Sequence, residues 1–223
     1  MFSHVDAILF DLDGTLIDSV PDIAIAIDQL MDTLDLPRRG EAKVRQWVGN
    51  GSTNLIRRAL SDSMDGEADP ELMDRAKPLY RRFYGAQVCV HSRLYPGVVE
   101  GLDKLAKRKR FKLACVTNKP ADLAAPLLER IGIAHHFHAL VGGECTPTVK
   151  PAPECLLLAA SRIGVHISRC LMVGDSRNDI GAARNAGCPV VAVPYGYNHG
   201  RDIREFAPDI VIDSLPELSG LID

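Results

Sequence analysis

The amino-acid sequence predicts an α/β protein, in which a doubly wound parallel-sheet core carries an inserted all-helical cap domain. Short apolar runs alternate with helical patterns along residues 95–223. Most of these runs are continuous rather than alternating, which is typical of strands that are buried on both faces of a sheet. Residues 17–94 instead carry helical patterns and no convincing strand, so they interrupt the α/β order directly after the first strand.

The first predicted strand begins near residue 7 and ends at two acidic residues, Asp11 and Asp13. Further apolar runs predict strands at 112–116, 170–173 and 190–193, with shorter runs at 139–141 and 210–212. Helical patterns separate them at 98–109, 121–131, 153–163 and 178–186. Because strands that alternate with helices are joined by right-handed crossovers, we expect a parallel sheet.

The interrupting segment predicts four helices, at 22–34, 41–47, 53–63 and 70–87. The Tyr-Pro-Gly sequence at 95–97 then marks the return to the α/β pattern. We therefore expect residues 1–16 and 95–223 to form the core and residues 17–94 to form a cap above the end of the first strand. The alternative is a long insertion without a role in the site.

The composition argues against a nucleic-acid-binding or membrane protein. The 223 residues are 46% hydrophobic and 25% charged, and the formal charge of −3 provides no basic field for nucleic acid. No apolar run approaches the roughly 20 residues that span a bilayer, and the N-terminus has no signal-peptide pattern. Six scattered cysteines without a C-x-x-C pair suit reduced thiols. We expect a cytoplasmic protein, either a monomer or a homodimer.

The acidic pair at the end of the first strand is the strongest functional signal. Residues two apart in a strand point the same way, so Asp11 and Asp13 are expected to leave the sheet together at its carboxyl edge. Ligands bind at this edge in open α/β sheets. Two neighbouring carboxylates repel each other, and a bound divalent cation would offset the repulsion, with Mg²⁺ suited to oxygen ligands. The alternative is a simple Asp-Gly turn.

Two other segments carry polar groups that suit a phosphate. Thr117 and Asn118 follow the predicted strand at 112–116, where a hydroxyl and backbone N–H groups can meet a phosphate oxygen. Lys150 precedes Pro151 and Pro153, which should fix the loop and direct the ammonium group. Taken alone, the first signal also fits an ordinary loop and the second a surface lysine.

A second acidic pair follows the predicted strand at 170–173. Asp175 lies at the strand end, and Asp179 follows one helical turn later, while Gly174 permits a close backbone approach. Capping of the following helix could explain one of these acids. Capping hardly explains both Asp175 and Asp179, because they are expected to lie beside the acidic end of the first strand.

These four segments, in this order, resemble the phosphatase branch of the haloacid dehalogenase superfamily, whose core is Rossmann-like. The resemblance implies that Asp11 is the nucleophile and that Asp13 is the general acid and base. It also implies that Thr117 and Lys150 assist catalysis and that Thr15 and Asn118 bind the substrate. The implied Mg²⁺ ligands are Asp11, the backbone carbonyl of Asp13, Asp175 and Asp179.

A glycine-containing loop within the expected cap can select the substrate. Gly49, Asn50, Gly51 and Ser52 precede a predicted helix, whose N-terminal N–H groups favour an anion such as a carboxylate, and Arg58 can add a guanidinium group. This run resembles a subgroup of the superfamily, the bacterial phosphoglycolate phosphatases. The resemblance implies a small phosphorylated two-carbon acid as substrate. The alternatives are a capped turn and a solvated arginine.

Two other functions stay open at this level. One is a phosphatase or phosphomutase that acts on another phosphate ester or on pyrophosphate. The other is a signalling receiver domain, which also phosphorylates an aspartate on a doubly wound sheet. The long helical insertion and Asp13 argue against a receiver domain.

Overall fold

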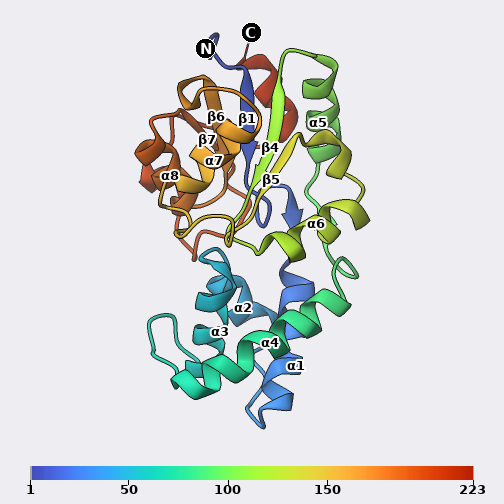
Figure 1. Ribbon diagram of the computed structural model, residues 1–223, viewed down its shortest axis with the longest axis vertical. Coiled ribbons are helices and arrows are strands. Elements are labelled where there is room, and N and C mark those ends of the chain that lie inside the picture. Colours follow the sequence, from blue (N-terminus) through green and yellow to red (C-terminus); the bar gives the residue numbers. More distant parts are fainter. Residues whose placement is uncertain (1, 223) are drawn as a thin grey trace.

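The computed structural model describes residues 2–222, and within this range six parallel strands form the central sheet. The strands are β1 (Ala7–Phe10), β4 (Lys112–Val116), β5 (Ala139–Val141), β6 (Cys170–Gly174), β7 (Val190–Ala192) and β8 (Ile210–Val211). Their order across the sheet is β5-β4-β1-β6-β7-β8. Helices cover both faces of the sheet (Figure 1), so the predicted doubly wound α/β core is confirmed.

The core helices follow the predicted order. They are α5 (Val98–Lys107), α6 (Ala121–Arg130), α7 (Glu154–Arg162) and α8 (Arg177–Ala186). Four short 3₁₀ helices were not predicted: Ala134–His136, Ile167–Arg169, Ile203–Phe206 and η4 (Leu215–Gly220). They are too short for an apolar repeat to mark them in the sequence.

Strand β1 lies between β4 and β6, and its side chains alternate between two apolar cores. Ile8 and Phe10 belong to the core that β1 forms with α5, α6 and η4. Ala7 and Leu9 belong to the core that it forms with α7 and α8. Both faces of the strand are therefore buried, which explains its continuous apolar sequence and holds its carboxyl end in a fixed position.

The four predicted helices of the inserted segment are present. They are α1 (Val20–Thr33), α2 (Gly40–Trp47), α3 (Gly51–Ser61) and α4 (Pro70–Ala86). They pack against one another at the end of the molecule opposite the termini (Figure 1), beyond the carboxyl ends of the sheet strands.

The expectation that residues 17–94 contain no strand was wrong. Strands β2 (Ile17–Asp18) and β3 (Arg93–Leu94) pair antiparallel at the two ends of this segment. Each has two residues, which is too few for a strand pattern to show in the sequence. The pair holds the two chain connections between helices and core side by side. The domain boundaries at 16/17 and 94/95 stay a prediction.

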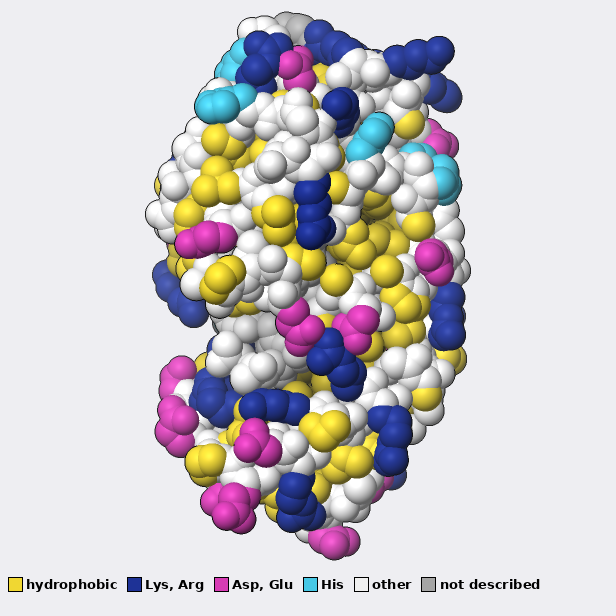
Figure 2. Space-filling model, viewed as in Figure 1, with side chains coloured by type: hydrophobic (Ala, Val, Ile, Leu, Met, Phe, Trp, Pro, Cys, Tyr) yellow, Lys and Arg dark blue, Asp and Glu magenta, His cyan; other side chains and the backbone are white. Residues whose placement is uncertain are grey.

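Charged side chains join the helical segment to the core. In Figure 2 acidic and basic side chains lie together where the two parts meet. Arg81 on α4 donates two hydrogen bonds to Asp122, at 2.8 and 2.9 Å, and one to Glu144 at 2.7 Å. These groups are about half exposed, so each pair contributes little alone.

No helix among the described residues is long and apolar enough to span a membrane. All six cysteines lie in the described range and are free thiols.

Candidate active site

The candidate site lies at the carboxyl ends of β1, β4 and β6. Asp11 follows β1, Thr117 follows β4 and Asp175 follows β6. After β1 the chain adds β4 and β5 on one side of β1. It then returns to form β6 on the other side of β1, followed outward by β7 and β8, so the topological switch point of the sheet lies between β1 and β6. Ligands bind at this position in open α/β sheets.

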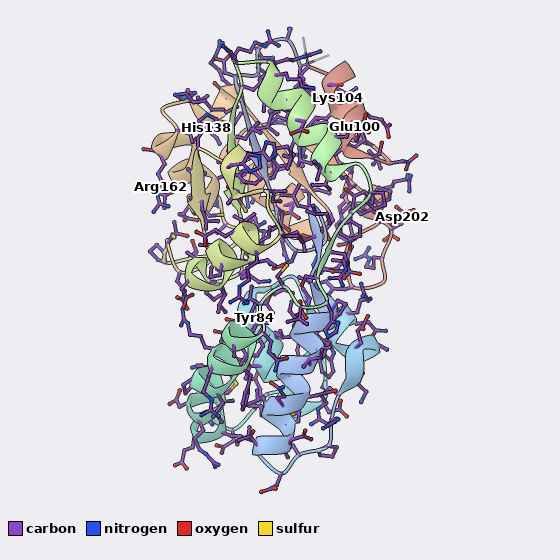
Figure 3. The ribbon with its side chains drawn as sticks, turned by 90° about the vertical axis from the view of Figure 1, so that its right-hand side faces the viewer. Tyr84, Glu100, Lys104, His138, Arg162 and Asp202 are labelled. Carbon is purple, nitrogen blue, oxygen red and sulfur yellow. The ribbon has the colours of Figure 1, made fainter. Side chains whose placement is uncertain are left out.

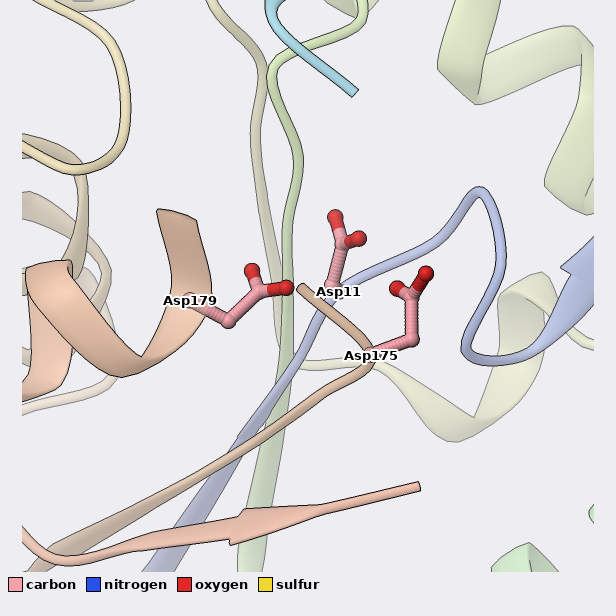
Figure 4. Close-up of side chains that lie close together, drawn as sticks. All are labelled: Asp11, Asp175 and Asp179. Atoms are coloured by element: carbon pink, nitrogen blue, oxygen red, sulfur yellow. The ribbon is translucent and has the colours of Figure 1, made fainter. Parts of the chain in front are cut away.

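Three buried carboxylates meet at the switch point. One oxygen from each of Asp11, Asp175 and Asp179 lies within 4.8 Å of the other two, and the side chains converge (Figure 4). Burial raises the pKa of Asp11 to about 7, with Lys150 opposing the rise and Asp179 adding to it. Burial together with the charges of Asp11 and Asp179 also holds the pKa of Asp175 well above its usual value. The cluster therefore favours either protons or a cation.

Lys150 is the counter-ion inside this cluster. Its Nζ donates to Asp11 Oδ1 and to Asp179 Oδ1, both at 2.7 Å, and to the backbone carbonyl of Val116 at 2.9 Å. Burial lowers the pKa of Lys150, but the charges of Asp11 and Asp179 outweigh burial and the pKa is raised. The ammonium group is therefore charged, and its three donors are all occupied.

Asn118 holds the backbone of Lys150 in place. Its Oδ1 accepts from the backbone N–H of Lys150 at 2.9 Å, and its Nδ2 donates to the Lys150 carbonyl at 3.1 Å. The same Nδ2 also donates to the carbonyl of Gly49 at 3.1 Å. Asn118 therefore joins the loop before α3 to the loop that carries Lys150.

Separate groups hold the other two acids. Asp175 accepts from the Thr15 hydroxyl at 2.8 Å and from the backbone N–H of Tyr197. Asp179 accepts from the backbone N–H and the hydroxyl of Ser176, at 3.0 and 2.7 Å, in a capping box that begins α8. Asp179 thus caps the helix and joins the acidic cluster, roles that the sequence analysis treated as alternatives.

The acidic cluster fits a divalent cation. Its donors are carboxylate oxygens, the ligands that hard cations prefer. Three carboxylates, each with a formal charge of −1, face one buried ammonium group, that of Lys150. A divalent cation would bring this formal charge to zero.

Asp13 lies outside the cluster, although it is two residues from Asp11. Its Oδ1 accepts from Lys119 Nζ at 2.6 Å and from the Ser19 hydroxyl. Asp11 and Asp13 therefore have different partners at the same strand end. Metal binding by Asp13, through its backbone carbonyl, stays a prediction.

A small cavity separates these groups from the helical segment. It encloses about 40 Å³, room for about three water molecules. Asp11, Asp13, Thr117, Asn118 and Lys119 line it from the core.

The loop before α3 forms the opposite wall of the cavity. Of the residues predicted to bind substrate there, Gly49, Gly51 and Ser52 line the cavity. Asn50 does not, because its side chain turns back and accepts from Arg58 at 3.0 Å.

Arg58 also lies away from this cavity. Its buried guanidinium group donates to the carbonyls of Trp47 and Met64 as well as to Asn50. Arg58 therefore supports the loop from behind in this arrangement. Thr15 likewise supports Asp175 rather than lining the cavity. Direct substrate contacts by Arg58 and Thr15 stay predictions.

Sequence reasoning missed three residues of the site. Lys119 directly follows the predicted Thr117–Asn118 pair, and its nearness to a strand end was an available signal. Ser19 and Tyr197 reach the site from the start of α1 and from the loop after β7. Tyr197 lies in the run at 195–198, which resembles the same family, but the sequence assigned it no role, and no local pattern marks Ser19.

Comparisons with known proteins agree with this geometry. A family model described as haloacid dehalogenase-like hydrolase matches residues 5–187. A phosphoglycolate phosphatase of Nitrosococcus oceani is 47% identical over 222 residues, covering all of this chain and 98% of that protein. One of Vibrio parahaemolyticus is 46% identical, covering 96% of this chain and 94% of that protein. A crystal structure of a predicted phosphoglycolate phosphatase from Haemophilus somnus has a TM-score of 0.90 at 37% identity, covering 98% of each chain.

Metal binding should depend on pH. In the metal-free protein the pKa of Asp11 is raised to about 7, so the folded state binds a proton that the unfolded state has lost. Asp11 therefore destabilises the fold as the pH rises from about 4 to about 7, and the raised pKa of Asp175 acts in the same direction. A bound cation removes this repulsion and needs the deprotonated groups. The increase in Tm caused by saturating MgCl₂ should therefore be larger at about pH 8 than at about pH 6. Equal increases at both pH values would contradict the protonated metal-free state.

The Gly196→Ala substitution should disrupt the acidic cluster. A Cβ at residue 196 would lie 2.3 Å from Asp175 Oδ2 and 2.3 Å from the carbonyl oxygen of Gly14, so Asp175 must move. We expect the affinity for Mg²⁺, measured by isothermal titration calorimetry, to fall about 10-fold or more. Gly220→Ala is the control, because a Cβ there meets no atom within 4 Å. An unchanged affinity in Gly196→Ala would argue against Asp175 as a ligand.

Proposed function

Because the chain belongs to the family of haloacid dehalogenase-like hydrolases, we propose that it is a Mg²⁺-dependent phosphatase that converts 2-phosphoglycolate and water to glycolate and phosphate. The observation that carries this proposal is the pairing of two acids with two lysines at one strand end. Asp11 faces Lys150 and the acidic cluster, whereas Asp13 faces Lys119 and the cavity. In this proposal Asp11 attacks phosphorus and Asp13 transfers the protons.

In the first step a carboxylate oxygen of Asp11 attacks phosphorus. An O–P bond forms on Asp11 while the ester P–O bond breaks, and the departing glycolate oxygen takes a proton from Asp13. Lys150 holds Asp11 Oδ1 at 2.7 Å and offsets its negative charge. Thr117 lines the same cavity and can donate its hydroxyl hydrogen to a phosphoryl oxygen.

In the second step water hydrolyses the aspartyl-phosphate. Asp13, now deprotonated, takes a proton from the water as the water oxygen bonds to phosphorus. The bond between Asp11 and phosphorus breaks, phosphate leaves, and Asp13 is again protonated. The Ser19 hydroxyl and Lys119 hold Asp13 for both transfers.

Asp11, Asp175, Asp179 and the backbone carbonyl of Asp13 would hold the Mg²⁺ ion. When bound, this ion supplies positive charge that stabilises the phosphoryl oxygens in the transition state. Thr15, Tyr197 and Ser176 keep the ligating carboxylates in place.

The substrate assignment rests on the names of the relatives and on the N–H groups at the start of α3. Relatives at 46–47% identity over nearly the full chain are named phosphoglycolate phosphatase. Helix α3 begins beside the cavity at Gly51, and its N-cap Asn50 makes no side-chain capping bond, which leaves N–H groups available for a carboxylate.

We further propose that residues 17–94 act as the substrate-selecting cap and that the enzyme works in the cytoplasm as a monomer or homodimer. The ion pairs between Arg81 and the core support a cap that closes over the site.

Phosphate release from 2-phosphoglycolate, pyrophosphate and hexose phosphates tests the proposed substrate. A preference for pyrophosphate or a hexose phosphate would refute it.

Asp11→Asn should lower kcat for 2-phosphoglycolate by more than about 10³-fold, because the amide cannot act as the nucleophile. Phosphate release measures the rate, and circular dichroism checks the fold. Asp74→Asn removes an 80% exposed carboxylate on α4 and serves as the control. Acid quenching with ³²P-labelled substrate should place the label on Asp11 in the wild type. A label on another residue would refute this nucleophile.

Asp13→Asn should separate the two steps when the leaving group needs no proton. With p-nitrophenyl phosphate we expect a burst of about one p-nitrophenol per site, followed by turnover about 10²-fold or more below that of the wild type, because water is no longer activated. Stopped-flow absorbance measures both phases. An unchanged steady-state rate would exclude an acid–base role for Asp13.

A further inference from the structure

Lys119 is the one basic side chain that lines the cavity among the described residues. It follows Thr117 and Asn118 in the turn between β4 and α6. The side chain is only 5% exposed, its Nζ lies 2.6 Å from Asp13 Oδ1, and it lies 4.9 Å from the centre of the Tyr84 ring. Figure 3 shows Tyr84 at the junction between the cap helices and the core.

The hydrogen bonds of Lys119 are incomplete. An ammonium group has three donors, and within the described chain Asp13 is the acceptor that Lys119 reaches. The Tyr84 ring stabilises the charge without accepting a hydrogen bond in the ordinary sense. A buried ammonium group with unoccupied donors favours a further anionic acceptor in the adjacent cavity.

Other basic groups near the site are already occupied. Lys150 directs its three donors to Asp11, Asp179 and the Val116 carbonyl. Arg58 donates to acceptors within the cap and does not line this cavity. Lys119 is therefore the positively charged side chain that is available to bind a second negative group of a substrate.

The position of Lys119 also fits the substrate. Asp13 must meet the ester oxygen to protonate it, and the carboxylate carbon of 2-phosphoglycolate is two bonds from that oxygen. A group within hydrogen-bond distance of Asp13 is therefore close to the carboxylate. The N–H groups at the start of α3 lie on the facing wall, where Gly51 and Ser52 line the cavity.

We propose, building on the proposed function, that Lys119 binds the carboxylate of the substrate and determines specificity for carboxylated phosphate esters. The rest of the cavity wall includes Ile23, Leu55, Tyr80 and Leu123, which supply largely apolar surface. An ester without a second anionic group leaves the Lys119 donors without an acceptor in this apolar setting. A site built in this way rejects such an ester more strongly than a purely apolar pocket does.

Two inhibitors that cannot be hydrolysed test this role without any proton transfer by Asp13. They are 3-phosphonopropionate and propylphosphonate, which differ by a carboxylate in place of a methyl group. We expect the wild type to bind 3-phosphonopropionate about 10-fold or more tightly than propylphosphonate, as measured by inhibition constants. Lys119→Met should abolish this preference, because it weakens the binding of 3-phosphonopropionate more than that of propylphosphonate. Lys119→Arg should retain part of the preference.

Further variants make the outcomes distinct. Lys119→Gln can keep a hydrogen bond to Asp13 but removes the charge, so it replaces Lys119→Met if that variant does not fold, and the same loss of preference is expected. Lys77→Met on α4 is the control, because this lysine is 46% exposed and does not line the cavity. A preference that survives in both charge-removing variants, or an equal loss for both inhibitors, overturns the proposal. Failure of the wild type to hydrolyse 2-phosphoglycolate would instead refute the proposed function, while the inhibition constants would still decide the role of Lys119.

Discussion

The close approach of three buried carboxylates at the switch point of the sheet governs the rest of the site. Asp11, Asp175 and Asp179 repel one another, and Lys150 alone does not balance them. The fold maintains this arrangement because β1 and β6 are neighbouring parallel strands, each buried on both faces. Removing one member of such a buried ion pair leaves an unpaired charge, which is more costly than losing a surface pair. Because a bound cation would relieve this repulsion, the arrangement of the three carboxylates favours cation binding.

The second acid of the strand end has a different environment, and this difference supports the two roles proposed for Asp11 and Asp13. Asp11 lies among carboxylates and beside Lys150, whereas Asp13 lies beside Lys119 and Ser19 at the cavity wall. Two carboxylates two residues apart can therefore act as nucleophile and as proton carrier. Pairs of acids in contrasting surroundings commonly divide their tasks in this way.

The sequence was sufficient to predict the core strands and the acids at their ends, because burial on both faces makes those strands continuously apolar. It could not predict β2 and β3, whose pairing depends on residues that are 75 or more positions apart. It also could not show that Tyr197 holds Asp175, because that contact comes from a loop without a repeating pattern. The burial of Arg58 could be predicted from the sequence. Arg58 lies three residues after the buried Leu55 on α3, so helical spacing places both side chains on the same face of the helix. Helical spacing does not predict which backbone carbonyls accept hydrogen bonds from Arg58.

The cap loop and the base of the site form one hydrogen-bonded unit. The Gly49 carbonyl accepts from Asn118 and from Asn178, both at 3.1 Å. Asn118 in turn binds both backbone polar groups of Lys150, the residue that neutralises Asp11. If the loop before α3 moved away, the side-chain amides of Asn118 and Asn178 would each lose the Gly49 carbonyl as an acceptor. The position of the loop before α3 and the placement of Lys150 beside Asp11 are therefore connected through one side chain, that of Asn118.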